Sequence, residues 1–336
     1  MKPVQIESAF SYHGLEINKA NHTEVVKSLI RNFLDDVQFD RSLPFLKDHE
    51  LEVATWTYFK SLNLGPKNER SVEKVLKLSS TLVQQSYTSL PFEIRVICSV
   101  QVVYMFLVDD IADDFMEELR CFGQNFIMNN GHKHPLLSRF DSHLRYLARY
   151  YGPYCHSTII KSIFDYINGR IIEHEMERTH FTFPADSNLM PVFLRGKVGA
   201  AEVLVSLLWP KTLFPEDTYL MQYFPITQEL VTFIDFTNDI LSYYKEFVIR
   251  DEKGNFVSNF AETHNMTYLD VLRHLTSYTP KVLMSVYKTL QGNESLLHPV
   301  QDFVNGWIML CTAHRRYHLV ELFADEGYLP PYDEDA

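Results

Sequence analysis

The segment ITQELVTFIDFTNDILSYYKEF, residues 226–247, has the pattern of a buried helix that carries oxygen-bearing side chains along one face. Asn238, Ser242 and Glu246 recur every four residues and therefore share a face of this helix. Asp239 points about 100° away and is predicted to support or cap that set. The neighbouring apolar residues are too numerous for an exposed helix: Leu230, Val231, Phe233, Ile234, Phe236, Ile240 and Leu241.

These three side chains form a ligand set that suits a hard divalent cation. Over eight residues a helix rises about 12 Å, so an amide oxygen, a hydroxyl and a carboxylate would lie in a row. Magnesium prefers such oxygens and commonly completes its coordination with phosphate oxygens of a substrate. The alternative is a chance polar stripe on a surface helix.

Outside this segment the apolar residues also recur at helical spacing, as in Val25, Leu29, Ile30 and Phe33. Alternating strand patterns are scarce, and breaks at proline and glycine separate roughly ten to twelve predicted helices. No Gly/Ser-rich linker, low-complexity block or repeat divides the chain. The sequence therefore predicts one all-α domain over residues 1–336, with flexible ends at 1–20 and 326–336.

The composition of the chain argues against several classes of function. The 336 residues include 43 acidic and 31 basic residues, for a formal net charge of −12, and no Lys/Arg cluster, so we expect no nucleic-acid partner. The twelve glycines form neither a dinucleotide-binding nor a P-loop motif. Four widely spaced cysteines, no secretory signal and an apolar stretch at 96–108 too short for a bilayer predict a cytoplasmic protein without stable membrane insertion.

A second acidic motif follows a strongly apolar helix in VVYMFLVDDIADDF, residues 102–115. On a continuous helix, Asp109 and Asp113 would stand one turn apart, about 5–6 Å from each other, and could approach a divalent cation together. An EF-hand does not fit, because Asp114 and Arg120 stand where its glycine and glutamate belong. The alternative is a solvated acidic helix end.

The two motifs D-D-x-x-D and N-D-x-x-S-x-x-x-E, each on its own helix, together resemble the signature of class I terpene cyclases. Four segments resemble the fungal trichodiene synthase family in the same order: YGPYCHSTIIKSIFDYINGRIIE, SLLWPKTLF, NDILSYYKEF and HRRYHLVELF. The likeness covers roughly residues 80–325. It implies a single-domain class I terpenoid synthase bundle of α-helices around a central apolar pocket, and a homodimer is an expectation from the same relatives.

The resemblance also implies a set of metal ligands. Three Mg²⁺ ions, or Mn²⁺ in their place, would be bound. Asp109 would bind two of them, with Asp113 in a supporting part. The third would be bound by Asn238, Ser242 and Glu246.

For the diphosphate group, the resemblance implies Lys245 and the pair Arg316-Tyr317. Arg195 would sense the diphosphate, with Gly199 as the carbonyl-bearing effector four residues later. Arg is suited to this work by its planar fork of donors. Each residue also has a structural alternative. Lys245 could be an ordinary solvated lysine, Arg316 could belong to an arginine pair at a helix end, and Gly199 could allow close helix packing.

The implied reaction is the ionisation of farnesyl diphosphate and cyclisation of the carbocation to a sesquiterpene hydrocarbon or alcohol, with release of diphosphate. This is lyase chemistry on a carbon–oxygen bond. Aromatic faces can stabilise a cation by roughly 0.5–2 kcal/mol, and Phe106, Phe233 and Trp307 are candidates for the pocket wall. For any one aromatic residue, ordinary core packing is the alternative.

Two other functions remain open. A chain-elongating isoprenyl diphosphate synthase shares the fold and the metal chemistry, but has a second aspartate-rich motif where this chain has Asn238, Ser242 and Glu246. A non-catalytic isoprenoid-binding helical protein would keep the apolar pocket, but would not need Arg195, Lys245 and Arg316 to converge.

Overall fold

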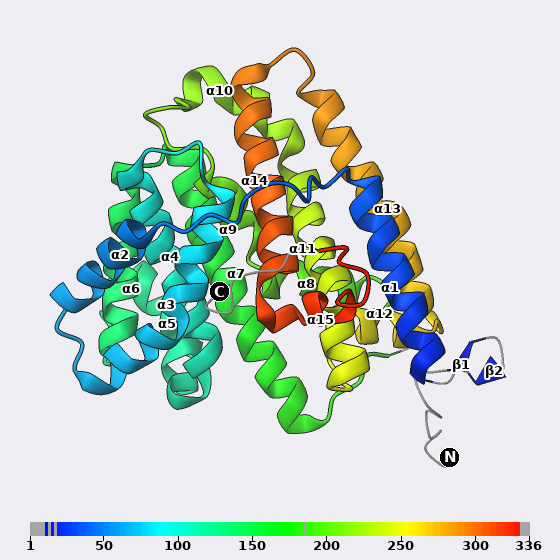
Figure 1. Ribbon diagram of the computed structural model, residues 1–336. Coiled ribbons are helices and arrows are strands. Elements are labelled where there is room, and N and C mark those ends of the chain that lie inside the picture. Colours follow the sequence, from blue (N-terminus) through cyan, green and yellow to red (C-terminus); the bar gives the residue numbers. More distant parts are fainter. Residues whose placement is uncertain (1–10, 13–14, 17–18, 185, 330–336) are drawn as a thin grey trace.

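Helices make up nearly all of the regular structure in a computed structural model of the chain, which describes residues 11–12, 15–16, 19–184 and 186–329 (Figure 1). The predicted all-α fold is confirmed. The two strands form a two-residue antiparallel hairpin, and η4 is a π-helix while the other η elements are 3₁₀ turns. The elements are β1 Ser11–Tyr12, β2 Leu15–Glu16, α1 Lys19–Asp36, α2 His49–Ser61, α3 Pro66–Ser86, α4 Phe92–Ile111, η1 Ala112–Phe115, α5 Met116–Met128, α6 Pro135–Tyr146, η2 Leu147–Arg149, α7 Pro153–Thr179, α8 Met190–Val198, α9 Ala201–Leu207, α10 Glu216–Tyr223, η3 Phe224–Ile226, α11 Thr227–Tyr243, η4 Tyr244–Ile249, α12 Phe256–His264, α13 Tyr268–Thr289, α14 Glu294–Ala313, η5 Arg315–Tyr317 and α15 Leu319–Leu322.

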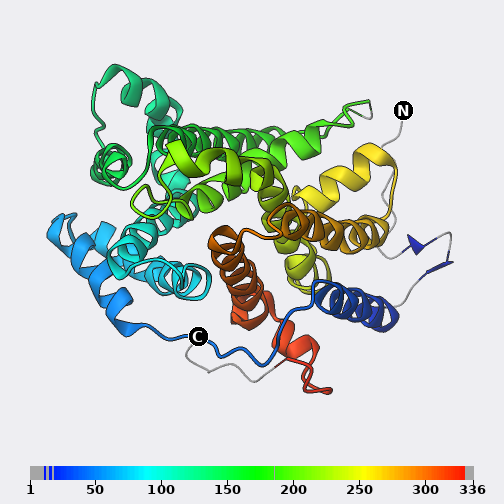
Figure 2. The ribbon, with the colours of Figure 1, turned by 90° about the horizontal axis from the view of Figure 1, so that it is seen from above.

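The long helices α3, α4, α7, α11 and α14 lie around one interior space (Figures 1 and 2). Each buries apolar side chains against its neighbours, because apolar surface gains free energy when it leaves water. Gly306 allows α14 to lie close to α3, since a Cβ there would overlap the backbone carbonyl of Gln85. Two walls of the interior space are thereby fixed relative to each other.

The C-terminal segment packs against the first helix. Lys27 of α1 forms ion pairs with Asp325 and Glu326, with N–O distances of 2.6 and 2.8 Å. Tyr328 donates a hydrogen bond to Asp35 at 2.9 Å, also on α1. Glu326 and Tyr328 thus contact α1, and the flexibility predicted for residues 326–336 stays a prediction. Of the other residues expected to be flexible, 1–10, 13–14, 17–18 and 330–336 lie outside the described part of the chain.

Within the described residues, no helix is both long enough and apolar enough to cross a bilayer. The apolar stretch at 96–108 lies inside α4, where most of its side chains are buried in the core.

His143 of α6 is buried, and neither ring nitrogen makes a hydrogen bond to any residue that the structure describes. Burial lowers the pKa of its imidazole from 6.5 to about 3. The unfolded chain therefore binds a proton near pH 6.5 that the folded chain takes up only near pH 3. This contribution to the unfolding free energy is fully present above pH 6.5 and is lost as the pH falls from about 6.5 to about 3.

We expect His143→Phe to flatten the decline of the unfolding free energy below pH 6.5. The neutral ring can pack against Tyr104, whose ring centre lies 5.4 Å from that of His143. The slope removed should approach about 1.4 kcal/mol per pH unit. Urea unfolding at pH 4.5, 5.5 and 7 measures it, with the exposed His298→Gln as control. An unchanged slope in His143→Phe would contradict the assignment.

Candidate active site

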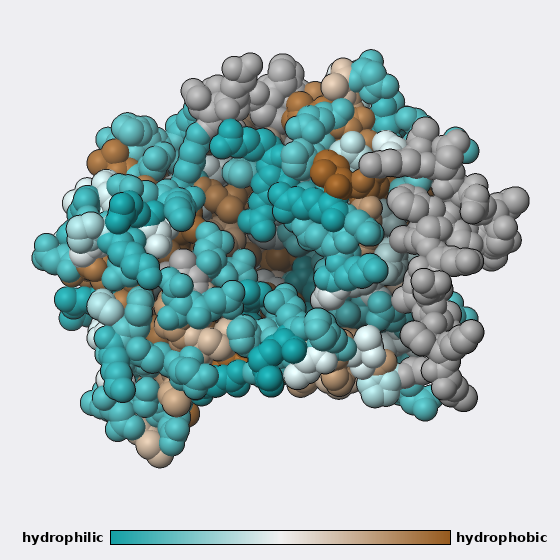
Figure 3. All heavy atoms as spheres, turned by 90° about the horizontal axis from the view of Figure 1, so that it is seen from below, coloured by the Kyte–Doolittle hydropathy of each residue, from teal (hydrophilic) through white to brown (hydrophobic). Residues whose placement is uncertain are grey.

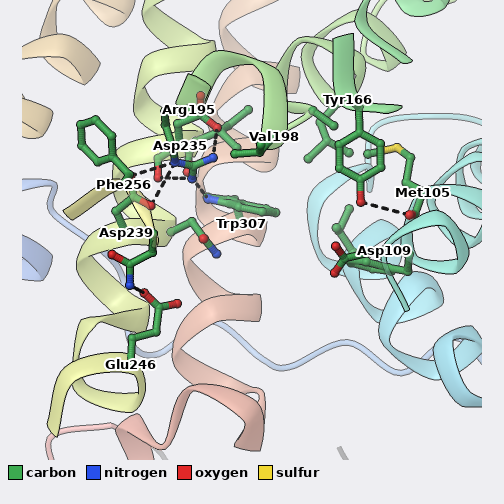
Figure 4. A pocket seen from close by; sticks show the side chains of 18 of the residues that line it. Met105, Asp109, Tyr166, Arg195, Val198, Asp235, Asp239, Glu246, Phe256 and Trp307 are labelled. Carbon is green, nitrogen blue, oxygen red and sulfur yellow. Dashed lines mark hydrogen bonds and ion pairs between the residues drawn. The ribbon is translucent and has the colours of Figure 1, made fainter. Parts of the chain in front are cut away.

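The interior space is a cavity of about 270 Å³, and both predicted metal motifs contribute to its wall. Figure 4 shows Met105, Asp109 and Tyr166 on one side and Arg195, Asp235, Asp239 and Glu246 on the other, with Trp307 between them. From below, the molecule is hollowed near its centre, with hydrophobic residues inside a mostly hydrophilic rim (Figure 3). Nine of the residues predicted from the sequence line the cavity: Phe106, Asp109, Arg195, Gly199, Asn238, Glu246, Trp307, Arg316 and Tyr317.

Asp109 stands near the end of α4 and faces α7 across the cavity wall. Its carboxylate lies 3.2 Å from Nε of Arg170, whose guanidinium also pairs with Glu173 at 2.6 Å. Burial raises the pKa of Glu173, and the Arg170 charge opposes that rise. Sequence reasoning missed Arg170 and Glu173. The available signal was their spacing of three residues within the segment that resembles the family.

Asp113 does not share a helix face with Asp109, which corrects the prediction made from their spacing. The α-helix ends at Ile111, and Asp113 lies in the 3₁₀ turn that follows. Because a 3₁₀ turn is tighter than an α-turn, a four-residue interval no longer returns to the same face. The Asp113 side chain is 84% exposed, pairs with His174 at 3.3 Å and does not line the cavity.

The motif N-D-x-x-S-x-x-x-E spans a change from α-helix to π-helix. Asn238 and Ser242 lie on α11, whereas Glu246 lies in the π-helix η4. Glu246 accepts a hydrogen bond from Asn255 at 3.0 Å and pairs with Lys245 at 3.1 Å. Such π turns occur often at functional sites. Asn255, the residue that caps α12, was not predicted from the sequence.

The polar atoms of α11 differ in how they are satisfied. The Asn238 amide donates to the phenol oxygen of Tyr317 at 3.0 Å, so its own carbonyl oxygen keeps its accepting capacity. The Ser242 hydroxyl is buried and makes no hydrogen bond within the described residues, and Ser242 does not line the cavity. An orphaned buried hydroxyl is costly unless a ligand or water satisfies it.

Arg195 is buried at the wall and fully engaged by two carboxyl groups of α11. Its Nε lies 2.9 and 3.0 Å from the two carboxylate oxygens of Asp239. Its Nη2 donates to the backbone carbonyl of Asp235 at 2.8 Å, and its Nη1 pairs with the Asp235 carboxylate at 3.0 Å. Burial raises the pKa of Asp239 to about 7 and that of Asp235 to about 6, and the Arg195 charge opposes both rises. Asp239 thus supports the site through Arg195.

The predicted effector Gly199 lies where the helix breaks between α8 and α9. The next residue, Ala200, has left-handed backbone with φ of 49°, which is costly for a residue with a Cβ. A Cβ at Gly199 would collide with the Asp235 carboxylate and the Arg195 guanidinium. The glycine is therefore required by the close approach of this ion pair, and the break brings residues 198–200 to the cavity wall.

Two other predicted residues lie away from the cavity. Lys245 is buried and paired with Glu246, and it does not line the wall. Phe233 of α11 is fully buried in the core and does not line the cavity, so its predicted place in the pocket wall is wrong. The helical period predicts that a residue is buried, but not which interior surface it meets.

Comparison with solved structures identifies the class of fold. A linalool/nerolidol synthase from Streptomyces clavuligerus matches with a TM-score of 0.61 and 12% identity, over 83% of this chain and 98% of that one. A hedycaryol synthase in complex with nerolidol matches with a TM-score of 0.52 and 12% identity, over 84% and 98% of the two chains. The fold is that of the terpene synthases.

Comparison of the amino-acid sequence assigns the chain to one family within this class. The profile of the trichodiene synthase (TRI5) family matches residues 59–329, and the chain belongs to this family. An (E)-beta farnesene synthase of Metarhizium brunneum is 24% identical over 89% of both chains. A trichodiene synthase of Paramyrothecium roridum is 25% identical over 80% of this chain and 69% of its own. The resemblance stated from the motifs is confirmed, and the protein is a lyase of the terpene cyclase class.

We expect Gly199→Ala to lower terpene formation by at least about 10-fold, because the added methyl group would displace Arg195 from Asp235. Thermal unfolding should show a lower midpoint as well. The matched control is Gly196→Ala in the preceding turn of α8, where an added Cβ meets nothing within 4 Å. Equal activities of the two variants would refute the packing argument.

Proposed function

We propose that the protein is a magnesium-dependent sesquiterpene synthase that ionises farnesyl diphosphate, cyclises the resulting carbocation and releases diphosphate. The observation that carries the proposal is the convergence of Asp109 from α4 with Asn238 and Glu246 from α11 and η4 on one cavity. The rest of that wall is largely apolar and aromatic. A charged head and an apolar chain would thus find complementary surfaces in one site.

The residues present fit a magnesium site. Asp109 and Glu246 supply carboxylate oxygens, and Asn238 keeps its carbonyl oxygen available, which is the donor set that Mg²⁺ prefers. The unsatisfied Ser242 hydroxyl supports the same interpretation, because it needs a partner. When bound, magnesium would supply Lewis-acid stabilisation of the departing diphosphate. Asp109 would hold magnesium on one side of the cavity, and Asn238, Ser242 and Glu246 would hold it on the other.

Cationic side chains near the cavity suit the diphosphate oxygens. Arg316 is exposed at the wall, so its guanidinium can donate hydrogen bonds to a bound anion. Tyr317 is buried beside it and lines the same cavity, and its phenol would be a second donor. Arg195 is engaged by Asp235 and Asp239, and it would act through the electrostatic field of its charge or by exchanging one of these partners. Lys245 would contribute by holding Glu246 in position.

The apolar part of the wall would exclude water from the carbocation, which water would otherwise quench. Phe106 lies on α4 one turn before Asp109, and Trp307 lies on α14. The indole N–H of Trp307 donates to the Ile234 carbonyl at 3.3 Å, which fixes the orientation of the ring. These two aromatic faces are our candidates for cation stabilisation.

The relatives support an isoprenyl diphosphate substrate. A matching structure of the Streptomyces clavuligerus synthase, with a TM-score of 0.58, is a complex with 2-fluorogeranyl diphosphate. The matched relatives named for farnesene and trichodiene favour a C15 substrate for this chain. An isoprenyl diphosphate synthase is disfavoured by Asn238 and Ser242 in place of a second aspartate-rich motif.

We expect purified protein incubated with farnesyl diphosphate and Mg²⁺ to release a C15 hydrocarbon or alcohol, measured by gas chromatography and mass spectrometry under an organic overlay. A chelator should abolish the product, because the leaving group would lose its charge stabilisation. Geranyl and geranylgeranyl diphosphate test the chain length. Formation of a longer isoprenyl diphosphate from added isopentenyl diphosphate would instead establish the prenyltransferase alternative.

Two aspartates of the D-D-x-x-D motif, Asp109 and Asp113, give a matched pair of variants. Asp109→Asn should lower turnover by about 100-fold, since it removes a carboxylate from the cavity wall. Asp113→Asn should change turnover by less than about 3-fold, because that side chain is exposed and points to α7. Steady-state rates across a Mg²⁺ titration measure both. A loss in Asp113→Asn equal to that in Asp109→Asn would argue against the separation seen in the structure.

A further inference from the structure

A second hollow lies outside the active site, between α7, α8 and the loop that joins them. Its volume is about 540 Å³, twice that of the active-site cavity and within the roughly 300–1000 Å³ range of small-molecule sites. We call it the α7–α8 groove. Its apolar wall includes Ile172, Met176, Phe181, Phe183, Met190 and Phe193.

The groove exposes large apolar side chains to solvent. Phe193 is 56% exposed, Phe181 48% and Met190 41%. Clustered apolar surface of this kind is unfavourable in water and commonly marks a place where an apolar ligand or partner is bound.

The polar groups of the groove offer nothing to a charged ligand. Glu175 is already bound by Arg120 and Arg178, and the Thr179 hydroxyl donates to the Glu175 carbonyl at 2.7 Å. No lysine, arginine or histidine is among the described residues that line the groove. An isoprenyl diphosphate would therefore meet the Glu175 carboxylate and no cation among the lining residues, because the guanidinium groups of Arg120 and Arg178 are paired with Glu175. An uncharged isoprenoid would meet mainly apolar side chains.

One helix separates this groove from the active site. Leu194 of α8 lines both hollows, while the preceding Phe193 lines only the groove and the following Arg195 lines only the active-site cavity. The two hollows thus have the Leu194 side chain in common in their walls. A neutral molecule formed in the cavity has this apolar surface next to it.

On the basis of the proposed function, we propose that the α7–α8 groove binds the neutral isoprenoid product after it leaves the active site. Loss of diphosphate turns an anionic substrate into a hydrocarbon or simple alcohol, which lacks the negative charge that the cationic side chains and metal sites of the cavity would bind and has a high cost of transfer to water. The groove offers such a molecule continuous apolar contact next to the site where it is made.

The test is a binding measurement that needs no turnover. The neutral fluorophore N-phenyl-1-naphthylamine is bound to the protein in the presence of chelator and displaced with (E)-β-farnesene. Phe193→Glu and Met190→Glu should each weaken this binding by at least about 10-fold, because they place a carboxylate in the groove. The matched control is Val192→Glu, which changes an exposed apolar residue of α8 that does not line the groove.

Thermal unfolding establishes that each variant is folded, and Phe193→Gln replaces Phe193→Glu if that chain does not fold. Unchanged displacement in the groove variants, or equal weakening in Val192→Glu, overturns the proposal. It is also overturned if the groove variants alter only the oligomeric state or only co-sedimentation with phosphatidylcholine vesicles, since the occupant would then be a second copy or a membrane.

The result separates this inference from the function on which it rests. Normal terpene formation with unchanged farnesene binding in Phe193→Glu would overturn the groove and leave the synthase function intact. Weakened farnesene binding in Phe193→Glu, with no terpene formed by the unaltered protein, would support the groove as an isoprenoid site and refute the synthase function.

Discussion

The buried guanidinium of Arg195 is the constraint on which the active-site wall depends. An unpaired charge in such a place would cost several kcal/mol, so the chain must bring carboxylates to it. Asp235 and Asp239, one turn apart on α11, meet this need and thereby fix α8 against α11. The same contact leaves no room for a side chain at Gly199, and the helix breaks there. Fold and site are therefore determined together at this point.

The sequence allowed the all-α fold and much of the site to be predicted because both depend on local patterns. Asn238 and Glu246 both reach the cavity, and Asp109 reaches it at the end of an apolar helix. Asp113 was misplaced because a change from α-helix to 3₁₀ turn alters the face that a residue occupies, and nothing in the spacing shows such a change. Phe233 was misplaced because the helical period identifies burial alone.

The residues that were missed come from contacts between distant segments. Arg170 reaches Asp109 from α7, and Asn255 reaches Glu246 from the start of α12. The sequence around Arg170 or Asn255 does not show which residue the side chain contacts, since each contact depends on how two helices pack. These partners set the charge around the predicted metal ligands. The Asp109 carboxylate faces the Arg170 guanidinium. The Glu246 carboxylate faces the Asn255 amide and the Lys245 ammonium group.

Each hydrogen-bonded turn of the π-helix η4 contains one more residue than a turn of α-helix. Its wider turn holds Glu246 at the cavity and Lys245 buried behind it, an arrangement that a continuous α-helix would rotate. Deleting one residue between Tyr243 and Glu246 would move Glu246 back by one position along the helix and turn its side chain by about 100° about the helix axis. Homologues that differ in length by one residue here would thus present a different side chain to the ligand, although their motifs look nearly identical when written as text.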